Sequence, residues 1–197
     1  MSEAKGVSQE IRAATVYFAK EGPGNTRETL RLARARATEL GIKDILVATT
    51  QGETGVLACQ ELQGFRVVVV SHSTGFKGPD AQEVTPENRA RILEMGGEVL
   101  TATHAFGGVG RAVRRRLNTY QTEEIIAFTL RVFGEGVKVV CEIALMAADA
   151  GLVRTDREVI AIGGTGRGAD TAVVLRPANA QDFFSLRVKE IICKPRL

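Results

Sequence analysis

Two segments combine glycine with hydroxyl side chains at spacings that suit a phosphate. The first, "ATTQGETG" at residues 48–55, follows an apolar run and precedes a helical pattern, and the second is "GGTGRGADTA" at residues 163–172. A helix start offers free N–H groups and a partial positive charge, and glycine turns can direct successive N–H groups at an anion. The alternatives are a capped helix start without a ligand and a wide flexible turn. The residues expected to contact a phosphate are Thr49, Thr50, Gln51, Gly52 and Thr54 in the first segment, and Gly164, Thr165, Gly166, Arg167 and Gly168 in the second.

The second segment also has the G-x-G-x-x-G/A spacing of a dinucleotide-binding loop, through Gly164, Gly166 and Ala169. That spacing has meaning only where the loop leaves a strand and begins a helix. Residues 171–175 are instead a short β-rich run that ends before a proline, so we expect residues 163–170 to join two antiparallel strands. A plain hairpin needs only about two to five loop residues, and the extra length favours an anion-binding or lid loop over a wide turn. No Gly-Lys-Ser or Gly-Lys-Thr occurs, which excludes a P-loop.

His72, Thr74 and Gly75 follow the β-branched run at residues 66–71, and His104 follows a later apolar run. In an open α/β sheet the loops after parallel strands share one edge, where ligands bind. We therefore expect His72, Thr74 and Gly75 to contact a ligand at this edge. A structural hydrogen-bonding role is the alternative for both histidines. Two histidines without a nearby carboxylate or cysteine pattern do not predict a metal site.

Two other pairs of residues could contribute to the site. Asn25 and Thr26 begin a helical pattern, where they either face the ligand or only cap the helix. Glu142 and Asp149 are seven residues apart in an apolar helical pattern, and they therefore share a face. If they are buried near the ligand, one of them could serve as an acid or base. Capping of a neighbouring loop, or pairing with an arginine, is the alternative.

The positions of these residues depend on an alternating order of elements. Apolar runs predict strands at residues 15–18, 44–49, 66–71, 98–102, 158–162, 171–175 and 187–193. Helical patterns, with Asn25 and Thr85 as expected N-caps, cover residues 25–41, 54–62, 85–96, 122–133 and 137–150. Strand–helix alternation that ends in strands predicts one α/β domain over residues 1–197, with three layers, a mostly parallel sheet and an antiparallel C-terminal hairpin. Three strand segments lack polar alternation: residues 45–47, 67–70 and 159–162. We therefore expect these segments to be buried on both faces of the sheet.

Composition limits the partners of the chain. A net charge of +3 over 197 residues is too small to indicate nucleic acid, and the basic cluster "RAVRRR" at 111–116 is predicted to be a solvated helix face rather than a phosphate or RNA contact. No apolar run approaches the ~20 residues of a membrane helix, and the polar start, Met1 to Glu10, is unlike a secretory signal. Three distant cysteines in apolar stretches predict buried free thiols and a cytoplasmic protein. The expected partner is a phosphorylated small molecule, and a homo-oligomer is left open.

Longer stretches resemble the C-terminal α/β domain of pyruvate kinase. In "ILVATTQGETGVLACQELQGFRVVVVSHST" a strand ends in a Thr/Gly loop that begins a helix and leads to a Val-rich strand, and "EVIAIGGTGRGADTAVVLRPA" is similar to the last hairpin of that domain. In pyruvate kinases that use a sugar-bisphosphate activator, the two corresponding loops bind it together. The resemblance implies that residues 49–54 hold a phosphate and that Gly164, Gly166 and Gly168 close over it.

The chain is also similar to free-standing proteins built on this domain in archaea and some bacteria, over stretches that include "NTRETLRLA", "STGF", "EIALMAADAG" and "KEIICKPR". That resemblance implies bound flavin mononucleotide (FMN). The catalytic barrel of the kinase takes roughly 250 residues, for which this chain has no room, so pyruvate kinase activity is not expected. The expected function is binding of a phosphorylated molecule, with FMN first. A flavin-dependent oxidoreductase, or another enzyme acting on a phosphorylated metabolite, is the alternative. With 5% aromatic residues and no Trp, a flavin ring would be covered by apolar side chains or Phe106.

Overall fold

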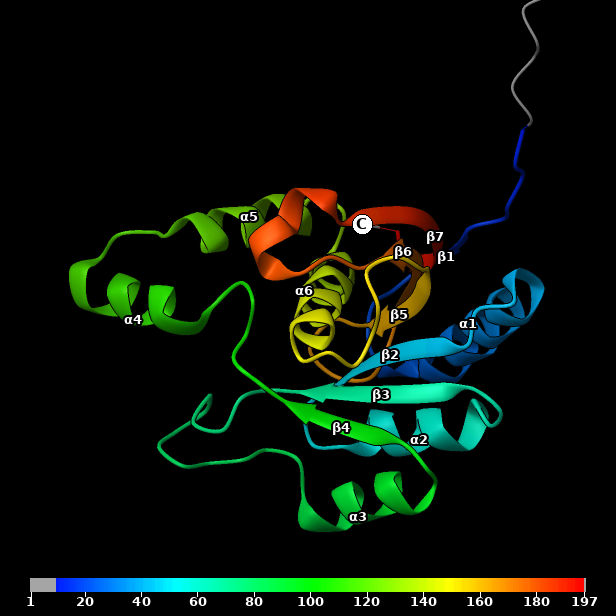
Figure 1. The fold of residues 1–197 in the computed structure, drawn as a ribbon, viewed down its shortest axis with the longest axis horizontal. Helices are drawn as coiled ribbons and strands as arrows, with labels where there is room; N and C mark the ends of the chain where they lie inside the picture. The colour runs from blue at the N-terminus through cyan, green and yellow to red at the C-terminus, as the bar shows by residue number, and fades with distance from the viewer. Residues whose placement is uncertain (1–9, 197) are drawn as a thin grey trace, which may run out of the picture.

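A mixed β-sheet runs through the centre of the computed structural model, which describes residues 10–196. Its seven strands have the order β1-β7-β6-β5-β2-β3-β4 (Figure 1). The pairs β5·β6 and β6·β7 are antiparallel, and the other pairs are parallel. This arrangement confirms the predicted fold class. The strands are β1 (Val16–Phe18), β2 (Asp44–Thr49), β3 (Arg66–Ser71), β4 (Glu98–Thr101), β5 (Val159–Gly163), β6 (Thr171–Arg176) and β7 (Arg187–Pro195).

The loop after β5 reverses the chain, as the short β-rich run that follows it predicts. β5 and β6 pair antiparallel from Gly163 with Thr171 to Val159 with Leu175. No helix begins between the two strands, so the dinucleotide-binding alternative is excluded. The first strand, β1, then pairs with β7 in parallel. As a result β1, rather than the C-terminal hairpin, forms this edge of the sheet.

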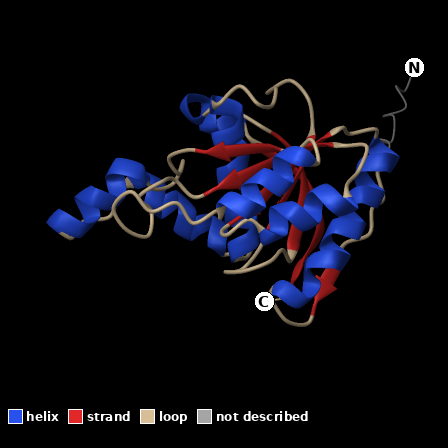
Figure 2. Cartoon of the chain, turned by 90° about the horizontal axis from the view of Figure 1, so that it is seen from below, coloured by secondary structure: helices blue, strands red, loops and turns tan. Residues whose placement is uncertain are grey.

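Helices cover both faces of the sheet, as Figures 1 and 2 show. The first hydrophobic cluster joins one face to α1, α2 and α3, and the second joins the other face to α5 and α6. Successive side chains of a strand point to opposite faces, so Ile45 and Val47 belong to the first cluster and Leu46 to the second. The helices are α1 (Thr26–Leu40), α2 (Glu53–Glu61), α3 (Pro86–Glu94), α4 (Gly108–Leu117), α5 (Thr122–Arg131) and α6 (Glu135–Asp149), with 3-10 turns at η1 (Pro23–Asn25) and η2 (Ala180–Ser185).

The three strand segments without polar alternation are buried, as predicted. Every residue of 45–47, 67–70 and 159–162 is at most 4% exposed. Cys59, Cys141 and Cys193 are also buried and free, which confirms the prediction for the thiols. Burial raises the pKa of Cys141 to about 12, so that thiol stays protonated at neutral pH. Among the described helices, none is both long and apolar enough to cross a bilayer. The polar start before Glu10 lies outside the described residues.

The two predicted N-caps differ in outcome. Thr85 caps α3, since its Oγ1 accepts a hydrogen bond from the N–H of Asn88 at 3.2 Å. Asn25 directly precedes α1, but its side chain donates to the carbonyl of Lys20 at 2.8 Å and does not cap the helix. The capping prediction for Asn25 is therefore wrong, because a nearer loop carbonyl takes its amide group.

The arginine cluster of α4 is only partly a solvated face. Arg111 lies over the ring of Phe76, with 4.7 Å between its Cζ and the ring centroid. Arg114 pairs with Glu124 of α5 at 2.6 Å. The remaining two, Arg115 and Arg116, are exposed as predicted. The helix periodicity gives each arginine a different neighbour, so the cluster does not act as one surface.

A buried carboxylate closes the glycine-rich loop. Asp170 is fully buried and accepts hydrogen bonds from the N–H of Gly22 at 3.0 Å, the N–H of Thr165 at 3.2 Å and the hydroxyl of Thr171 at 2.9 Å. Gly22 lies just before α1, so this one side chain ties the loop after β5 to the chain before the first helix. Thr26 adds a second tie, because its Oγ1 accepts from the N–H of Ala169 at 3.0 Å.

Replacement of Asp170 by Ala is expected to lower the free energy of unfolding by about 3 kcal/mol, because each buried N–H left without an acceptor costs about 1–3 kcal/mol. Urea denaturation followed by circular dichroism measures this difference. Asp149→Ala is the control. Its carboxylate also accepts two hydrogen bonds, from Asn179 and Ala180, but in an exposed place, so its loss is expected to cost about 1 kcal/mol or less. Equal losses in the two variants would contradict the anchoring role of Asp170.

Candidate functional site

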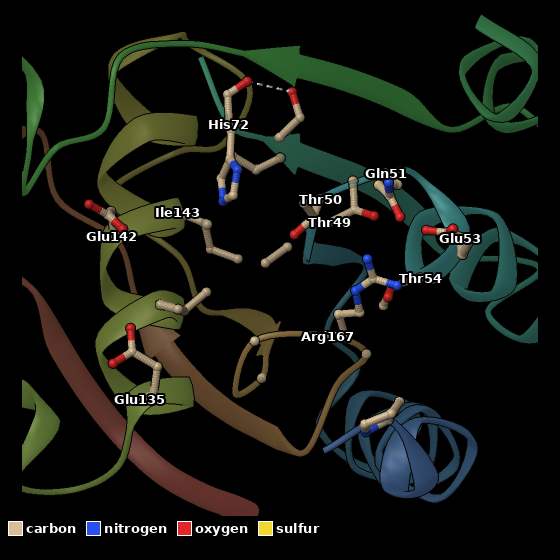
Figure 3. Close-up of a pocket in the computed structure, with 18 of the residues that line it drawn as sticks. Thr49, Thr50, Gln51, Glu53, Thr54, His72, Glu135, Glu142, Ile143 and Arg167 are labelled. Atoms are coloured by element: carbon tan, nitrogen blue, oxygen red, sulfur yellow. Dashed lines mark hydrogen bonds between the residues drawn. The ribbon is translucent and has the colours of Figure 1, made fainter. Parts of the chain in front are cut away.

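A cavity of about 800 Å³ opens at the carboxyl ends of β2, β3 and β5 (Figure 3). Its wall includes the first turns of α1, α2 and α6, the loop after β5, and residues that follow β3 and β4. In a parallel α/β arrangement the helices run back against the strands, so their starts meet at the same edge. The cavity is therefore the meeting point of segments that lie far apart in the sequence.

The start of α2 forms one side of the cavity. Thr49, at the end of β2, accepts a hydrogen bond from the N–H of Gly52 at 3.1 Å through its Oγ1. Gly52 has a φ of +104°, and a Cβ at this position would lie 2.5 Å from the Cβ of Asn88. Gly52 is thus needed for backbone geometry and for packing against α3, although the sequence predicts it as a phosphate contact. Gly52 is the N-cap of α2 and has no side chain that could accept from the first N–H groups of the helix. Thr54, in the first turn of α2, lines the cavity.

The glycine-rich loop forms the adjacent side. Gly168 has a φ of +70°, and a Cβ there would lie 2.5 Å from Pro23 Cα and 2.5 Å from Thr26 Oγ1. Only glycine allows the loop to pack this closely on the start of α1. Arg167 has no carboxylate within ion-pair distance among residues 10–196, and Figure 3 shows its side chain directed toward the start of α2. A free guanidinium therefore lies between the two predicted phosphate loops.

Aromatic rings gather at the part of the cavity formed by the loops after β3 and β4. Phe76 stacks on His104, with ring centroids 4.7 Å apart and an interplanar angle of 13°. His72 lies 4.2 Å from Phe76 and 5.2 Å from His104 between centroids. Its Nδ1 is 2.6 Å from Oε2 of Glu83. Thus one histidine has a carboxylate partner that comes from the same long loop.

One stripe of α6 adds a buried ion pair to the wall. Lys138 Nζ donates to Glu142 Oε2 at 2.5 Å, and the N–H of Phe106 donates to Glu142 Oε1 at 3.1 Å. Nδ1 of His104 lies 3.6 Å from the same Oε1. Burial would raise the pKa of Glu142, but the contacts with His104 and Lys138 outweigh it and lower the pKa to about 2. Glu142 is therefore ionised at neutral pH and is a charge partner rather than a proton donor.

Ten of the predicted site residues line this one cavity: Thr26, Thr49, Thr50, Gln51, Thr54, His72, Gly164, Gly166, Arg167 and Gly168. The lining does not include five others: Asn25, Gly52, Thr74, Gly75 and Thr165. The hydroxyl of Thr74 accepts from the Gln82 amide at 3.3 Å. Gly75 borders a second, smaller cavity of about 170 Å³. The N–H of Thr165 points to Asp170 instead.

The structure decides between the alternatives for Glu142 and Asp149 and corrects the expectation for Phe106. Asp149 is exposed and binds Asn179 and Ala180, so it caps η2 while Glu142 alone faces the cavity. Phe106 packs edge-on against Phe183, with centroids 5.8 Å apart, and Phe76 lines the cavity in its place. Both differences depend on where loops return to the sheet, which helical periodicity does not specify.

Sequence reasoning missed several lining residues. Lys138 could have been found, because it precedes Glu142 by four residues in an apolar helix, the spacing of a helical ion pair. Arg111 belongs to the basic cluster at residues 111–116, which the sequence predicts to be a solvated helix face. Phe76 and Glu83 carry no local signal, since they belong to an irregular loop. No group of three or more His, Cys, Asp or Glu within residues 10–196 has an arrangement that could hold a metal ion.

Comparison with known proteins gives a family. The model of the family "Pyruvate kinase, alpha/beta domain" matches residues 27–175, from α1 into β6, and leaves out β1 and β7. A solved pyruvate kinase from Cryptosporidium parvum is 15% identical, covers 78% of this chain and 23% of its own, and has a TM-score of 0.41. A second structure of the enzyme from this organism is 13% identical, with coverages of 78% and 22% and a TM-score of 0.39. A third, solved with ADP, is 15% identical, with coverages of 76% and 22% and a TM-score of 0.37.

The chain therefore spans less than a quarter of each of these pyruvate kinase chains. The family match, by contrast, extends over most of the sequence and contains both glycine-rich loops of the cavity. It confirms the resemblance that the two loop sequences indicated. The chain belongs to the pyruvate kinase alpha/beta domain family.

Proposed function

We propose that this protein binds a phosphorylated small molecule, FMN in the first place, in the cavity at the carboxyl ends of β2, β3 and β5. The observation that carries the proposal is the convergence of three helix starts on one cavity. The N-caps of α1, α2 and α6 form no side-chain cap hydrogen bond, and the first turn of each helix contributes to the lining. Uncapped helix starts favour anions through their free N–H groups and the helix dipole. At α1 the dipole is the contribution, because the N–H of Thr26 already donates to the carbonyl of Pro23.

The charges of the wall support an anionic ligand. Arg27 pairs with Glu61, Arg131 with Glu135 and Lys138 with Glu142. Arg111 and Arg167 also line the cavity, and neither has a carboxylate partner within residues 10–196. Of the carboxylates that line the cavity, Glu53 has no cation partner within residues 10–196. The phosphate would occupy the end between Thr54 and Arg167, where the start of α2 and the guanidinium of Arg167 lie on the same side of the cavity.

The size and the remaining lining suit a ligand with a ring. A volume of about 800 Å³ falls within the 300–1,000 Å³ of typical small-molecule sites. Apolar side chains that can cover a flavin ring are Leu57, Val70, Val139, Ile143 and Met146. The proposal does not include phosphoenolpyruvate chemistry. A cytoplasmic location, which the three buried thiols support, belongs to the same proposal.

An enzyme that acts on a phosphorylated molecule is the second candidate, and the ionisable pairs of the wall favour it. His72 with Glu83 and Lys138 with Glu142 border the same cavity. Carboxylate-held bases at a ligand cavity are typical of acid–base sites. In the flavin version of this candidate, the protein would be an oxidoreductase.

Thr54→Asp is expected to abolish most of the affinity for FMN while leaving the fold unchanged. An acidic residue suits the first turn of α2, but its carboxylate would repel the phosphate by about 4 kcal/mol for unit charges ~4 Å apart near a surface. Fluorescence-quenching titrations measure the affinity, and circular dichroism reports the fold. Riboflavin lacks the phosphate, so its weaker binding should hardly change.

Thr122→Asp is the matched control for this substitution. Thr122 also lies in the first turn of a helix, α5, but it is exposed and does not line the cavity. It should bind FMN as the wild type does. If Thr54→Asp retains the wild-type affinity for FMN, the phosphate is not bound at the start of α2 and the proposal fails.

The oxidoreductase candidate predicts a change in the visible spectrum. The FMN-loaded protein, mixed with reduced nicotinamide under nitrogen, should lose its flavin absorbance faster than free FMN does. The absorbance should return on admission of air. A rate equal to that of free FMN would leave ligand binding as the function and exclude the oxidoreductase with this donor.

A further inference from the structure

His72 is held by its Nδ1 atom. The carboxylate of Glu83 lies 2.6 Å from Nδ1, and the side chains of His72 and Glu83 are 29% and 16% exposed. An ionised carboxylate only accepts hydrogen bonds, so Nδ1 carries the hydrogen. Which nitrogen of a histidine is protonated is set by the bond that the other nitrogen makes. In the neutral ring, Nε2 is therefore left as an acceptor.

The second nitrogen of His72 faces the cavity without a protein partner. Figure 3 shows the imidazole projecting into the space opposite Arg167. Nε2 makes no hydrogen bond to any residue of the described part of the chain. Phe76 and His104 pack around the ring and fix its plane. An acceptor with a fixed direction is thus aimed at whatever fills this end of the cavity.

The charged groups around this atom come from several elements. Glu83 contacts the ring from the β3–α3 loop, and Arg111 of α4 lies on the far side of Phe76. Lys138 and Glu142 of α6 neutralise each other in the same wall. The free Nε2 atom itself requires a hydrogen-bond donor on the ligand, so at this atom the ligand is distinguished by hydrogen bonding.

On the basis of the proposed function, we infer that Nε2 of His72 accepts a hydrogen bond from an N–H or O–H at the ligand end opposite the phosphate. Glu83 is a positioning residue that fixes the tautomer. The cavity then selects phosphorylated molecules whose far end carries a donor in the plane of a ring. The ring imide N–H of FMN belongs to this class, and a sugar phosphate without a ring donor does not.

The chain has two histidines, which makes the test direct. Protein labelled with ¹⁵N-histidine is studied by long-range ¹H–¹⁵N correlation over a series of pH values, so that the neutral ring is observed directly. His72→Phe retains a ring for packing and assigns the signals. Wild-type His72 should be the Nδ1–H tautomer, and its Nε2 signal should move with FMN and with riboflavin but not with inorganic phosphate. Glu83→Gln should give a mixture of tautomers.

Affinity provides the second readout. His72→Phe should weaken the binding of FMN and of riboflavin by the same factor, about tenfold for one hydrogen bond of ~1.4 kcal/mol. Glu83→Gln should weaken both by a smaller factor, because the fraction of the protein in the Nδ1–H tautomer still binds. Glu87→Gln, an exposed carboxylate on α3, is the control and should change neither affinity. If His72 had only a structural role, its Nε2 signal would not shift when FMN or riboflavin binds.

The outcomes separate this inference from the proposed function. Thr54→Asp could weaken the binding of FMN while His72→Phe and Glu83→Gln leave the affinities for FMN and riboflavin unchanged. That result overturns the inference, and the phosphate site stands. An Nε2 signal that moves with inorganic phosphate alone also overturns it. If the wild type binds neither FMN nor riboflavin, both the inference and the proposed function fail.

The surface of α4 and α5 exposes many large apolar side chains. Fourteen large apolar side chains are exposed in the described residues, and seven of them lie within residues 109–133. Ile125, Phe128 and Val132 are spaced as one helix face and are 56%, 54% and 75% exposed. α4 itself has no buried residue, and Figures 1 and 2 place it at the outer end of the molecule.

We propose that this α4–α5 face binds the same face of a second copy of the chain. A whole aromatic side chain takes roughly 150–250 Å², and Tyr120, Phe128 and Phe133 are each more than half exposed. These three rings alone expose roughly 300 Å² of the ~800 Å² that each partner gives to a standard interface. Arg115 and Arg116 have no carboxylate partner, and Glu123 has no cation partner, within residues 10–196. A two-fold interface brings the same patch of both chains together, so these opposite charges can pair across it.

Sedimentation equilibrium of the wild type should give twice the chain mass, and Ile125→Lys combined with Val132→Lys should give the mass of one chain. Leu93→Lys combined with Phe184→Lys, which alters exposed apolar residues elsewhere, should remain a dimer. A monomeric wild type overturns the proposal, as does a control that dissociates to the same extent. Binding of the wild type to anionic vesicles, lost in the first double variant without any dimer, would assign the face to a lipid surface and also overturn it.

Discussion

One buried carboxylate holds together the segments on which the cavity depends. Asp170 is fully buried and accepts from Gly22, which is 148 residues away in the sequence. A carboxylate without such donors would be costly to bury, so the loop after β5 and the chain before α1 fold together or not at all. Gly168 strengthens the coupling, because any side chain there would collide with Pro23 and Thr26. The glycines of this loop thus serve packing as much as they serve an anion.

The direction of the strands decides which other groups join this unit. The parallel strands β2, β3 and β5 end at one edge, so the loops that follow them and the helices that run back all contribute their starts there. The cavity acquires two ends of different character in this way. The end near Arg167 has backbone donors and a free guanidinium, whereas the end near His72 has rings and carboxylate-held bases. A ligand with a phosphate and a ring fits both ends at once.

The charged residues of α6 show why an apolar helix can carry polar groups at a cavity. Lys138 and Glu142 are buried, but each satisfies the other, and Phe106 adds a backbone donor to the carboxylate. Loss of either partner would leave a buried charge, which is strongly destabilising. This pair fixes the electrostatic balance of the wall, so the cations left for a ligand are Arg111 and Arg167 among the described residues. The arginine cluster of α4 could not be divided in this way from its sequence alone.

Local patterns in the sequence determined the strands, the helices, the buried runs and the antiparallel return after residues 163–170, because periodicity, caps and turn residues act over a few neighbours. They also determined which loops share an edge, since parallel strands leave no other arrangement. The tertiary structure alone decided that Thr26 lines the cavity while Asn25 turns to Lys20, and that Phe76 replaces Phe106. It alone brought Glu83 to His72 and Asp170 to Gly22. These contacts depend on the paths of irregular loops and on the packing of distant segments, and no local spacing specifies either.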